Sequence, residues 1–154
     1  MEGTIQPLVS IGVVFGSFSS SYTSSLPTYA CRDVEVADVN LDGYEDIVFI
    51  NHVQGAANNY VYTTSSMVYY GSSGGFSVNN RDDLLSYGAT DGELADLNND
   101  GYPELLINAY YNGSSYETTA YIHWGDPDGY DAGGRTSIPA VGMVNGIQVV
   151  GAFE

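Results

Sequence analysis

Residues 34–51 read VEVADVNLDGYEDIVFIN and residues 92–108 read GELADLNNDGYPELLIN, so one motif recurs 58 positions further along the chain. The match has no gap between the first aspartate and the last acid of either copy. Recurrence at a fixed spacing is the sequence signature of a repeat architecture. The chain is therefore expected to consist of repeated structural units.

A second landmark, an aromatic residue and a glycine at the end of a short apolar run, occurs at 13–16, 67–71 and 121–125. Behind the last two copies, Gly75-Phe-Ser and Arg81-Asp-Asp-Leu recur as Gly129-Tyr-Asp and Arg135-Thr-Ser-Ile. Each unit thus offers four short strands, which is the size of a propeller blade.

The spacing predicts an all-β fold of propeller blades, each of four antiparallel strands, with about three blade equivalents in the chain. The expected strands are 34–38, 46–51, 60–70 and 76–85, then 93–96, 104–109, 118–124 and 130–138. One repeat domain would span residues 1–154, with a partial blade at 1–32, blades at 33–90 and 91–144, and the first strand of a shared blade at 145–154.

Composition supports the all-β prediction, because 19 Gly and 14 Tyr accompany short Val, Ile and Thr runs. No long segment has apolar residues at helical spacing. Cys31 is the single cysteine, so no disulfide forms within the chain. No run approaches the length of a membrane span and no signal peptide is recognisable. We expect no membrane insertion, and we favour an excised or mature part of an exported protein over a cytoplasmic one.

The formal net charge is −16, because 19 acids face three arginines and no lysine. A protein binds nucleic acid by neutralising its phosphates with Lys and Arg, so nucleic acid is not expected as a partner. The acids are compatible with two roles, solubility and cation binding.

Residues 38–46 and 96–104 form two loops that carry oxygen donors at corresponding positions. Counted from Asp38 or Asp96, positions one, three, five and nine carry side-chain oxygens, position six is glycine, and the carbonyl of position seven is a further donor. Hard oxygen donors without His or Cys select Ca²⁺ over zinc or copper. The predicted ligands of the two calcium ions are Asp38, Asn40, Asp42, Tyr44 and Asp46 in the first loop and Asp96, Asn98, Asp100, Tyr102 and Glu104 in the second.

An EF-hand begins similarly, but it requires a bidentate Glu at position twelve and flanking helices. Position twelve is Phe49 in one loop and Ile107 in the other, and the flanks alternate as strands do. The remaining alternative is a turn rich in Asn and Asp that binds nothing, since these residues favour turns without a metal.

These loops, with the Tyr-Gly and Trp-Gly strand ends that follow, resemble the FG-GAP or VCBS repeats of integrin-like calcium-binding β-propellers. The resemblance implies structural calcium ions and a non-catalytic role in adhesion, carbohydrate binding or extracellular scaffolding. It also implies an extracellular or cell-surface location. Where a third calcium loop would begin, near Val149, the acids are missing.

Three blade equivalents are too few for an ordinary closed ring, so we expect a head-to-tail homodimer that closes a six-blade ring. The alternative is that the sequence is a piece of a longer propeller.

No catalytic residue is predicted. His52 and His123 are the only histidines, and neither lies in a recognisable triad motif.

Aromatic residues crowd the strands and connections, and the 108–116 loop could present rings and amides to a sugar or protein partner. The predicted function is a calcium-stabilised extracellular binding or adhesion module, with lectin-like carbohydrate binding as one form of it. The alternative is a structural self-assembling unit with no ligand beyond calcium. The aromatic residues are Tyr62, Tyr69, Tyr70, Tyr110, Tyr111, Tyr116, Tyr121 and Trp124.

Overall fold

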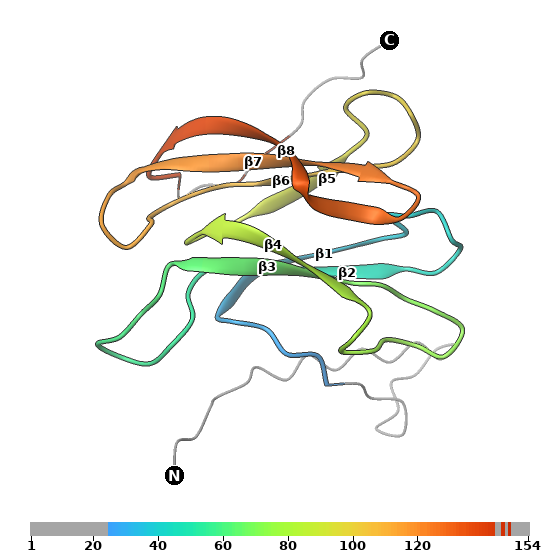
Figure 1. Cartoon of the computed structure of the whole chain (residues 1–154), viewed down its shortest axis with the longest axis horizontal. Coiled ribbons are helices and arrows are strands. Elements are labelled where there is room, and N and C mark those ends of the chain that lie inside the picture. The colour runs from blue at the N-terminus through green and yellow to red at the C-terminus, as the bar shows by residue number, and fades with distance from the viewer. Residues whose placement is uncertain (1–24, 144–145, 147, 149–154) are drawn as a thin grey trace.

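The computed structural model describes residues 25–143, 146 and 148, which form eight strands in two sheets (Figure 1). Every pair of neighbouring strands is antiparallel and consecutive in sequence. The described residues include no helix, and so none that is long and apolar enough to cross a membrane. The first sheet contains β1 (Cys31–Ala37), β2 (Asp46–Asn51), β3 (Thr63–Tyr69) and β4 (Arg81–Tyr87), and the second contains β5 (Gly92–Ala95), β6 (Glu104–Ile107), β7 (Glu117–Asp126) and β8 (Gly129–Val141).

The two sheets are copies of one four-stranded unit, and they lie face to face as two layers (Figure 1). β1 lies against β5 and β4 against β8, so the equivalent edge strands of the two units are neighbours. This arrangement confirms the all-β fold and is consistent with propeller blades. The two sheets do not close a ring.

The core between the layers forms because alternate residues of a strand point to opposite faces. Val48 and Ile50 of β2 are fully buried against Leu105 and Ile107 of β6. The intervening residues of β2 belong to a second cluster, which includes Leu26. β2 is consequently buried on both faces, as expected for a strand inside a stack of sheets.

One polar contact joins the layers at the start of β8. The Tyr70 hydroxyl donates to Asp82 Oδ2 at 2.6 Å, and the backbone N–H of Tyr130 points to both, 3.1 Å from the Tyr70 oxygen and 3.2 Å from Asp82 Oδ2. Tyr70 is 7% exposed, so these bonds lie largely away from water. The contact fixes the edge of one sheet against the other.

Several strand boundaries differ from the predicted ones. The third strand begins at Thr63 instead of residue 60, because the preceding segment makes only an isolated bridge between Gln54 and Val61. The fourth strand begins at Arg81 instead of residue 76, because a turn closed by the Asn80 N–H and the Ser77 carbonyl precedes it. The second unit is closer to its prediction, although β8 extends to residue 141.

The strands predicted before residue 25 and after residue 148 lie outside the described residues. The partial blade at 1–32, the shared strand at 145–154 and the domain boundaries drawn from them therefore remain predictions.

Candidate metal centres

The loops between β1 and β2 and between β5 and β6 have the same backbone conformation. Position four has positive φ in both, 59° at Leu41 and 63° at Asn99, and position six has φ 92° at Gly43 and 97° at Gly101. Glycine adopts positive φ without steric cost, which explains its presence at position six of each loop. The sequence repeat is thus also a repeat of loop geometry.

The first loop is organised by carboxylates and amides that accept bonds from its own backbone. Asp38 accepts the Asp42 N–H at 3.0 Å and the Gly43 N–H at 2.8 Å. Asn40 Oδ1 accepts the same Asp42 N–H at 3.2 Å, and Asp42 accepts the Tyr44 N–H at 2.9 Å. Positions one and three therefore direct oxygens to one point inside the turn.

The second loop repeats these bonds. Asp96 accepts the Asp100 N–H at 3.2 Å and the Gly101 N–H at 2.9 Å. Asn98 Oδ1 accepts the Asp100 N–H at 2.9 Å, and Asp100 accepts the Tyr102 N–H at 2.9 Å. Five residues of each loop thus take the same roles in the two copies.

Position nine differs from the exposed positions because its carboxylate is fully buried in both loops. Asp46 accepts the Val39 N–H at 2.9 Å and the Gly71 N–H at 2.8 Å, which ties the loop to the end of β3. Glu104 accepts the Leu97 N–H at 2.6 Å and a bond from the Gly125 backbone. Gly71 and Gly125, whose backbone N–H groups donate to these carboxylates, are the glycines of the recurring aromatic-glycine landmark.

Burial raises the pKa of both position-nine carboxyl groups, and the nearby acids of each loop raise it further, against the lowering effect of the backbone bonds. A raised carboxyl pKa means that the negative charge is poorly compensated where it lies. A cation beside the loop would supply the missing compensation.

The side-chain amide at position three lies beside carboxylates of the same loop. Asn40 Nδ2 lies 3.4 Å from Asp42 Oδ2. In the second loop, Asn98 Nδ2 donates to Asp100 Oδ2 at 2.9 Å and lies 3.5 Å from Glu104 Oε1. Positions three, five and nine of that loop therefore converge, with a weakly positive NH₂ group between two carboxylates.

The donor set fits calcium in chemistry, since every predicted side-chain ligand offers oxygen. In the described part of the chain, however, no three His, Cys, Asp or Glu side chains are grouped closely enough to hold a metal ion. Filling either site requires the side chains to turn from backbone amides and from each other toward an ion. Tyr44 and Tyr102 follow the turn, where only their backbone carbonyls are candidate ligands.

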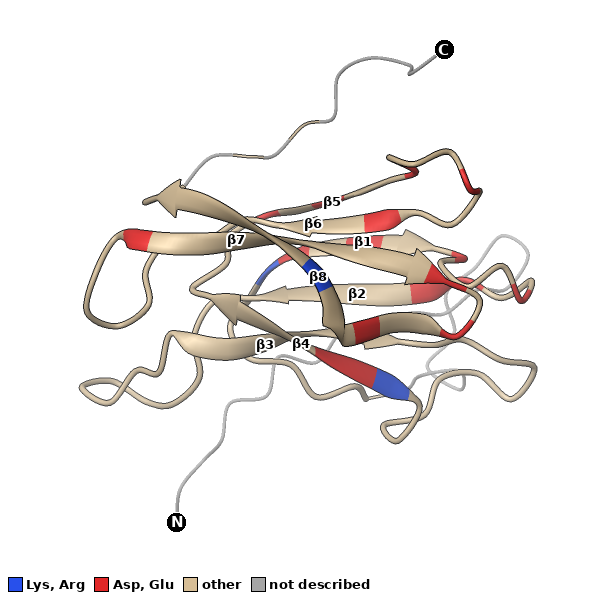
Figure 2. Cartoon of the chain, turned by 45° about the horizontal axis from the view of Figure 1, so that its top comes forward, with Lys and Arg blue, Asp and Glu red and all other residues tan. Residues whose placement is uncertain are grey.

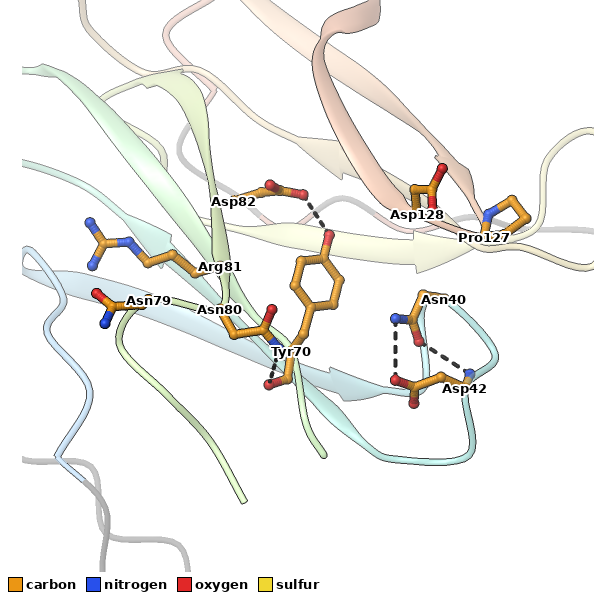
Figure 3. Close-up of a pocket in the computed structure, with 9 residues that line it drawn as sticks. All are labelled: Asn40, Asp42, Tyr70, Asn79, Asn80, Arg81, Asp82, Pro127 and Asp128. Carbon is orange, nitrogen blue, oxygen red and sulfur yellow. Dashed lines mark hydrogen bonds between the residues drawn. The ribbon is translucent and has the colours of Figure 1, made fainter. Parts of the chain in front are cut away.

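A pocket of about 390 Å³ lies beside the first loop, between the two sheets (Figure 3). Asn40 and Asp42 form one wall, and Pro127 and Asp128 of the β7–β8 turn form another. The lining also includes Tyr70, Asn79, Asn80, Arg81 and Asp82. Polar side chains of both signs surround this space, and no arrangement typical of catalysis is present among them.

The described acids are unevenly distributed over the molecule (Figure 2). Many lie on the two candidate metal loops and the neighbouring strand ends, whereas the loops at the opposite ends of β2 and β6 have none (Figure 2). The negative charge therefore gathers where the calcium ligands are predicted.

The two histidines have structural environments. His52 Nδ1 lies 3.0 Å from the Gly88 carbonyl oxygen and 3.1 Å from that of Ala89, and since a carbonyl only accepts, this nitrogen donates. His123 is fully buried in β7, as expected for a core residue. Among the described residues, neither histidine forms a hydrogen bond with a side chain that could act as a nucleophile.

Residues 89–123 match the family model of the FG-GAP repeat. This stretch holds β5, the second candidate metal loop, β6 and the first part of β7, so the chain carries an FG-GAP repeat and the predicted resemblance is confirmed there. No curated protein and no solved structure matches the chain. FG-GAP repeats build propeller-type modules, are in general not enzymes and are typical of extracellular or surface proteins.

Proposed function

We propose that this protein is a calcium-stabilised binding or adhesion module of the FG-GAP propeller type, which acts outside the cell and has no catalytic role. Each of its two loops holds one calcium ion. The observation that carries the proposal is the repetition of loop geometry, since both loops share positive φ at positions four and six and the same hydrogen bonds at positions one, three and five. The residues that hold each turn also offer the hard oxygen ligands that calcium prefers.

The ion would stabilise the β-hairpin. It would bind the exposed oxygens of positions one, three and five, the carbonyl of position seven and a free lone pair of the buried position-nine carboxylate. Because position nine is already bonded to the end of the third strand, the ion would link the turn to three strands of the sheet. Such a role is structural and explains why two sites occur in one small chain.

Calcium titration by calorimetry tests this proposal. The unaltered chain should bind two ions, and Asp38→Ala and Asp96→Ala should each leave one, because each variant loses the first ligand of a single loop. Binding of no calcium by a folded chain would contradict the proposal.

A second candidate, a self-assembling structural unit, is favoured by the open face of the second sheet. Four apolar residues lie on this face. Their equivalents in the first sheet are buried against the second sheet. Trp124 is 37% exposed and Ile138 is 40% exposed, whereas their equivalents Tyr70 and Leu84 are 7% and 0% exposed. The equivalent pairs are Leu106 and Val48, Ile122 and Val68, Trp124 and Tyr70, and Ile138 and Leu84.

This face has the composition of a contact between blades, so its natural occupant is another blade. A head-to-tail homodimer with a six-blade ring would cover it and leave no outer face open. The two candidate functions are compatible, because an assembled ring can also bind a ligand. A glycan array separates them: binding to defined sugars supports the binding module, while regular oligomers without any bound sugar support the purely structural unit.

A further inference from the structure

Five tyrosines and one histidine form a continuous aromatic cluster at the end of the sheets opposite the candidate metal loops. The cluster comes from the β2–β3 loop and the β6–β7 loop, the same connection in both units. We call it the tyrosine platform, and it consists of His52, Tyr60, Tyr62, Tyr110, Tyr111 and Tyr116. Tyr60 and His52 were not among the aromatic residues singled out from the sequence.

The rings of the platform contact one another across the boundary between the sheets. Tyr60 lies 6.5 Å from Tyr62 and Tyr62 lies 4.9 Å from Tyr111, measured between ring centroids. Tyr111 in turn lies 4.8 Å from Tyr116, and Tyr110 lies 5.2 Å from Tyr116. Tyr60 belongs to the first unit and Tyr116 to the second, and each is 52% exposed.

The platform is held from beneath by His52, which is 8% exposed. Its ring lies 5.6 Å from Tyr62 and 5.9 Å from Tyr110, and its Nδ1 bonds to the backbone where the first unit joins the second. The Gly88 N–H also donates to the Tyr62 carbonyl at 2.8 Å. The rings are therefore ordered before any ligand arrives, which lowers the entropy cost of binding.

The two loops that carry the tyrosine platform contain no charged residue. Residues 52–63 and 108–116 contain no Asp, Glu, Lys or Arg, although the whole chain has a net charge of −16. Glu117, which directly follows Tyr116, is the first acid after the second of these loops. The rim carries amides and hydroxyls instead, with Asn58, Asn59 and Ser114 exposed. These loops therefore offer a ligand aromatic ring faces and neutral hydrogen-bonding groups.

We propose that the tyrosine platform binds a neutral oligosaccharide. The C–H faces of sugar rings carry small positive charges that complement the negative faces of aromatic rings, and sugar hydroxyls bond to amides and hydroxyls. A row of rings running from one unit to the next suits an extended chain of sugar rings. Neither loop offers a cation to an anionic ligand, and an apolar partner would leave the amides and hydroxyls of the rim without bonds. This assignment rests on the proposed binding module and gives it a ligand class and a site.

The test is calorimetric titration of the full chain, with calcium present, against hexasaccharides of β-1,4-glucose, β-1,3-glucose, β-1,4-N-acetylglucosamine and α-linked mannose. An anionic hexagalacturonate serves as the charged comparison. For the neutral sugar that binds best, Tyr60→Ala and Tyr116→Ala should each lower the affinity about tenfold, since each removes an exposed stacking ring. Tyr60→Phe should retain most of the affinity, because the ring remains.

Val78→Ala is the matched control, since Val78 is 45% exposed and lies between β3 and β4, away from the platform. It should bind like the unaltered chain. The melting temperature of each variant shows whether the fold is intact, and these exposed positions should alter it little.

Three results would overturn the assignment: no neutral sugar binds, the anionic sugar binds better than all neutral ones, or both Tyr→Ala variants bind normally. A fourth comes from a glycoprotein with neutral high-mannose glycans, tested before and after enzymatic removal of the glycans. Binding that survives their removal would identify a protein partner instead.

If calcium raises the melting temperature but no sugar binds, this assignment fails while calcium stabilisation stands. If calcium leaves the melting temperature unchanged but sugar binds, the sugar assignment stands while calcium stabilisation fails.

Discussion

His123 occupies in the second unit the position that Tyr69 occupies in the first, and both side chains are fully buried. The Tyr69 hydroxyl donates to the Pro27 carbonyl at 2.6 Å and accepts a bond from Arg81 at 3.0 Å. Neither ring nitrogen of His123 has a hydrogen-bond partner among the described residues. Burial, and to a smaller degree the charge of Arg135, lower the pKa of His123 to about 4.

The first prediction concerns acid stability. The His123 pKa is lowered from 6.5, so its stabilising contribution is fully present above pH 6.5 and is lost as the pH falls toward about 4. The loss amounts to about 3 kcal/mol, because each pKa unit corresponds to 1.36 kcal/mol. In His123→Leu, the fall in unfolding free energy between neutral pH and pH 4 should be smaller by about that amount. Denaturant titrations with calcium chelated measure it, and an unchanged fall would contradict the assigned environment.

The second prediction concerns the contact between the sheets at Gly129. A Cβ at this position would collide with the Tyr70 hydroxyl, and φ is +100°. Gly75, its equivalent in the first unit, has φ +83° but open space around it. Gly129→Ala should therefore destabilise the fold by about 2 kcal/mol more than Gly75→Ala, which carries similar backbone strain without the clash. Equal losses in denaturant titrations would mean that Tyr70 does not pack there.

At the scale of elements, each metal loop is a compact turn that its own backbone bonds can hold without an ion. The positions with exposed side chains can then respond to calcium while position nine stays fixed by its buried bonds. The loop therefore needs only local side-chain rotation to bind, and the strands on either side keep their register.

The third prediction adds a carboxylate to the second loop. Asn98→Asp should raise the calcium affinity of that loop by about tenfold, because a full negative charge replaces an amide beside the ion. Without calcium it should lower the melting temperature, since Asn98 donates to Asp100 and an aspartate there would repel it. Asn99→Asp adds the same charge at a position that is not a predicted ligand, and it should alter affinity less. Equal effects of the two variants would place Asn98 outside the site.

The sequence predicted the loops well because their conformation follows from local chemistry, glycine at position six and oxygen donors before it. It did not reveal that the Asp46 carboxylate is buried and joins the loop to the end of β3. That contact depends on the Gly71 N–H, which is distant in sequence. The start of β4 was misplaced for a related reason. Val78 favours a strand, but the turn at Ser77 is closed before the strand begins.

At the scale of the molecule, the repeat predicts successive copies of one four-stranded unit, and the structure describes two such sheets that share a core containing Val48 and Leu105. The tyrosine platform could not be predicted in the same way. Its two loops differ in length and sequence, and their rings meet only because the sheets stack.

The fourth prediction concerns the open face of the second sheet. If this face meets another copy of the chain, Ile138→Glu should shift sedimentation toward the monomer, because it places a charge in an apolar contact. Val78→Glu, with the same charge at a comparably exposed site, should leave the oligomer intact. A monomer at every concentration for the unaltered chain would contradict assembly through this face.

The measurement that most directly tests the central claim is thermal unfolding with calcium and with chelator. Ligand that binds only the folded state raises stability by mass action, so two occupied loops should raise the melting temperature by about 10 °C. A chain carrying both Asp38→Ala and Asp96→Ala should melt at the same temperature in both conditions. The same melting temperature for the unaltered chain with calcium and with chelator would show that the loops are turns without a structural ion.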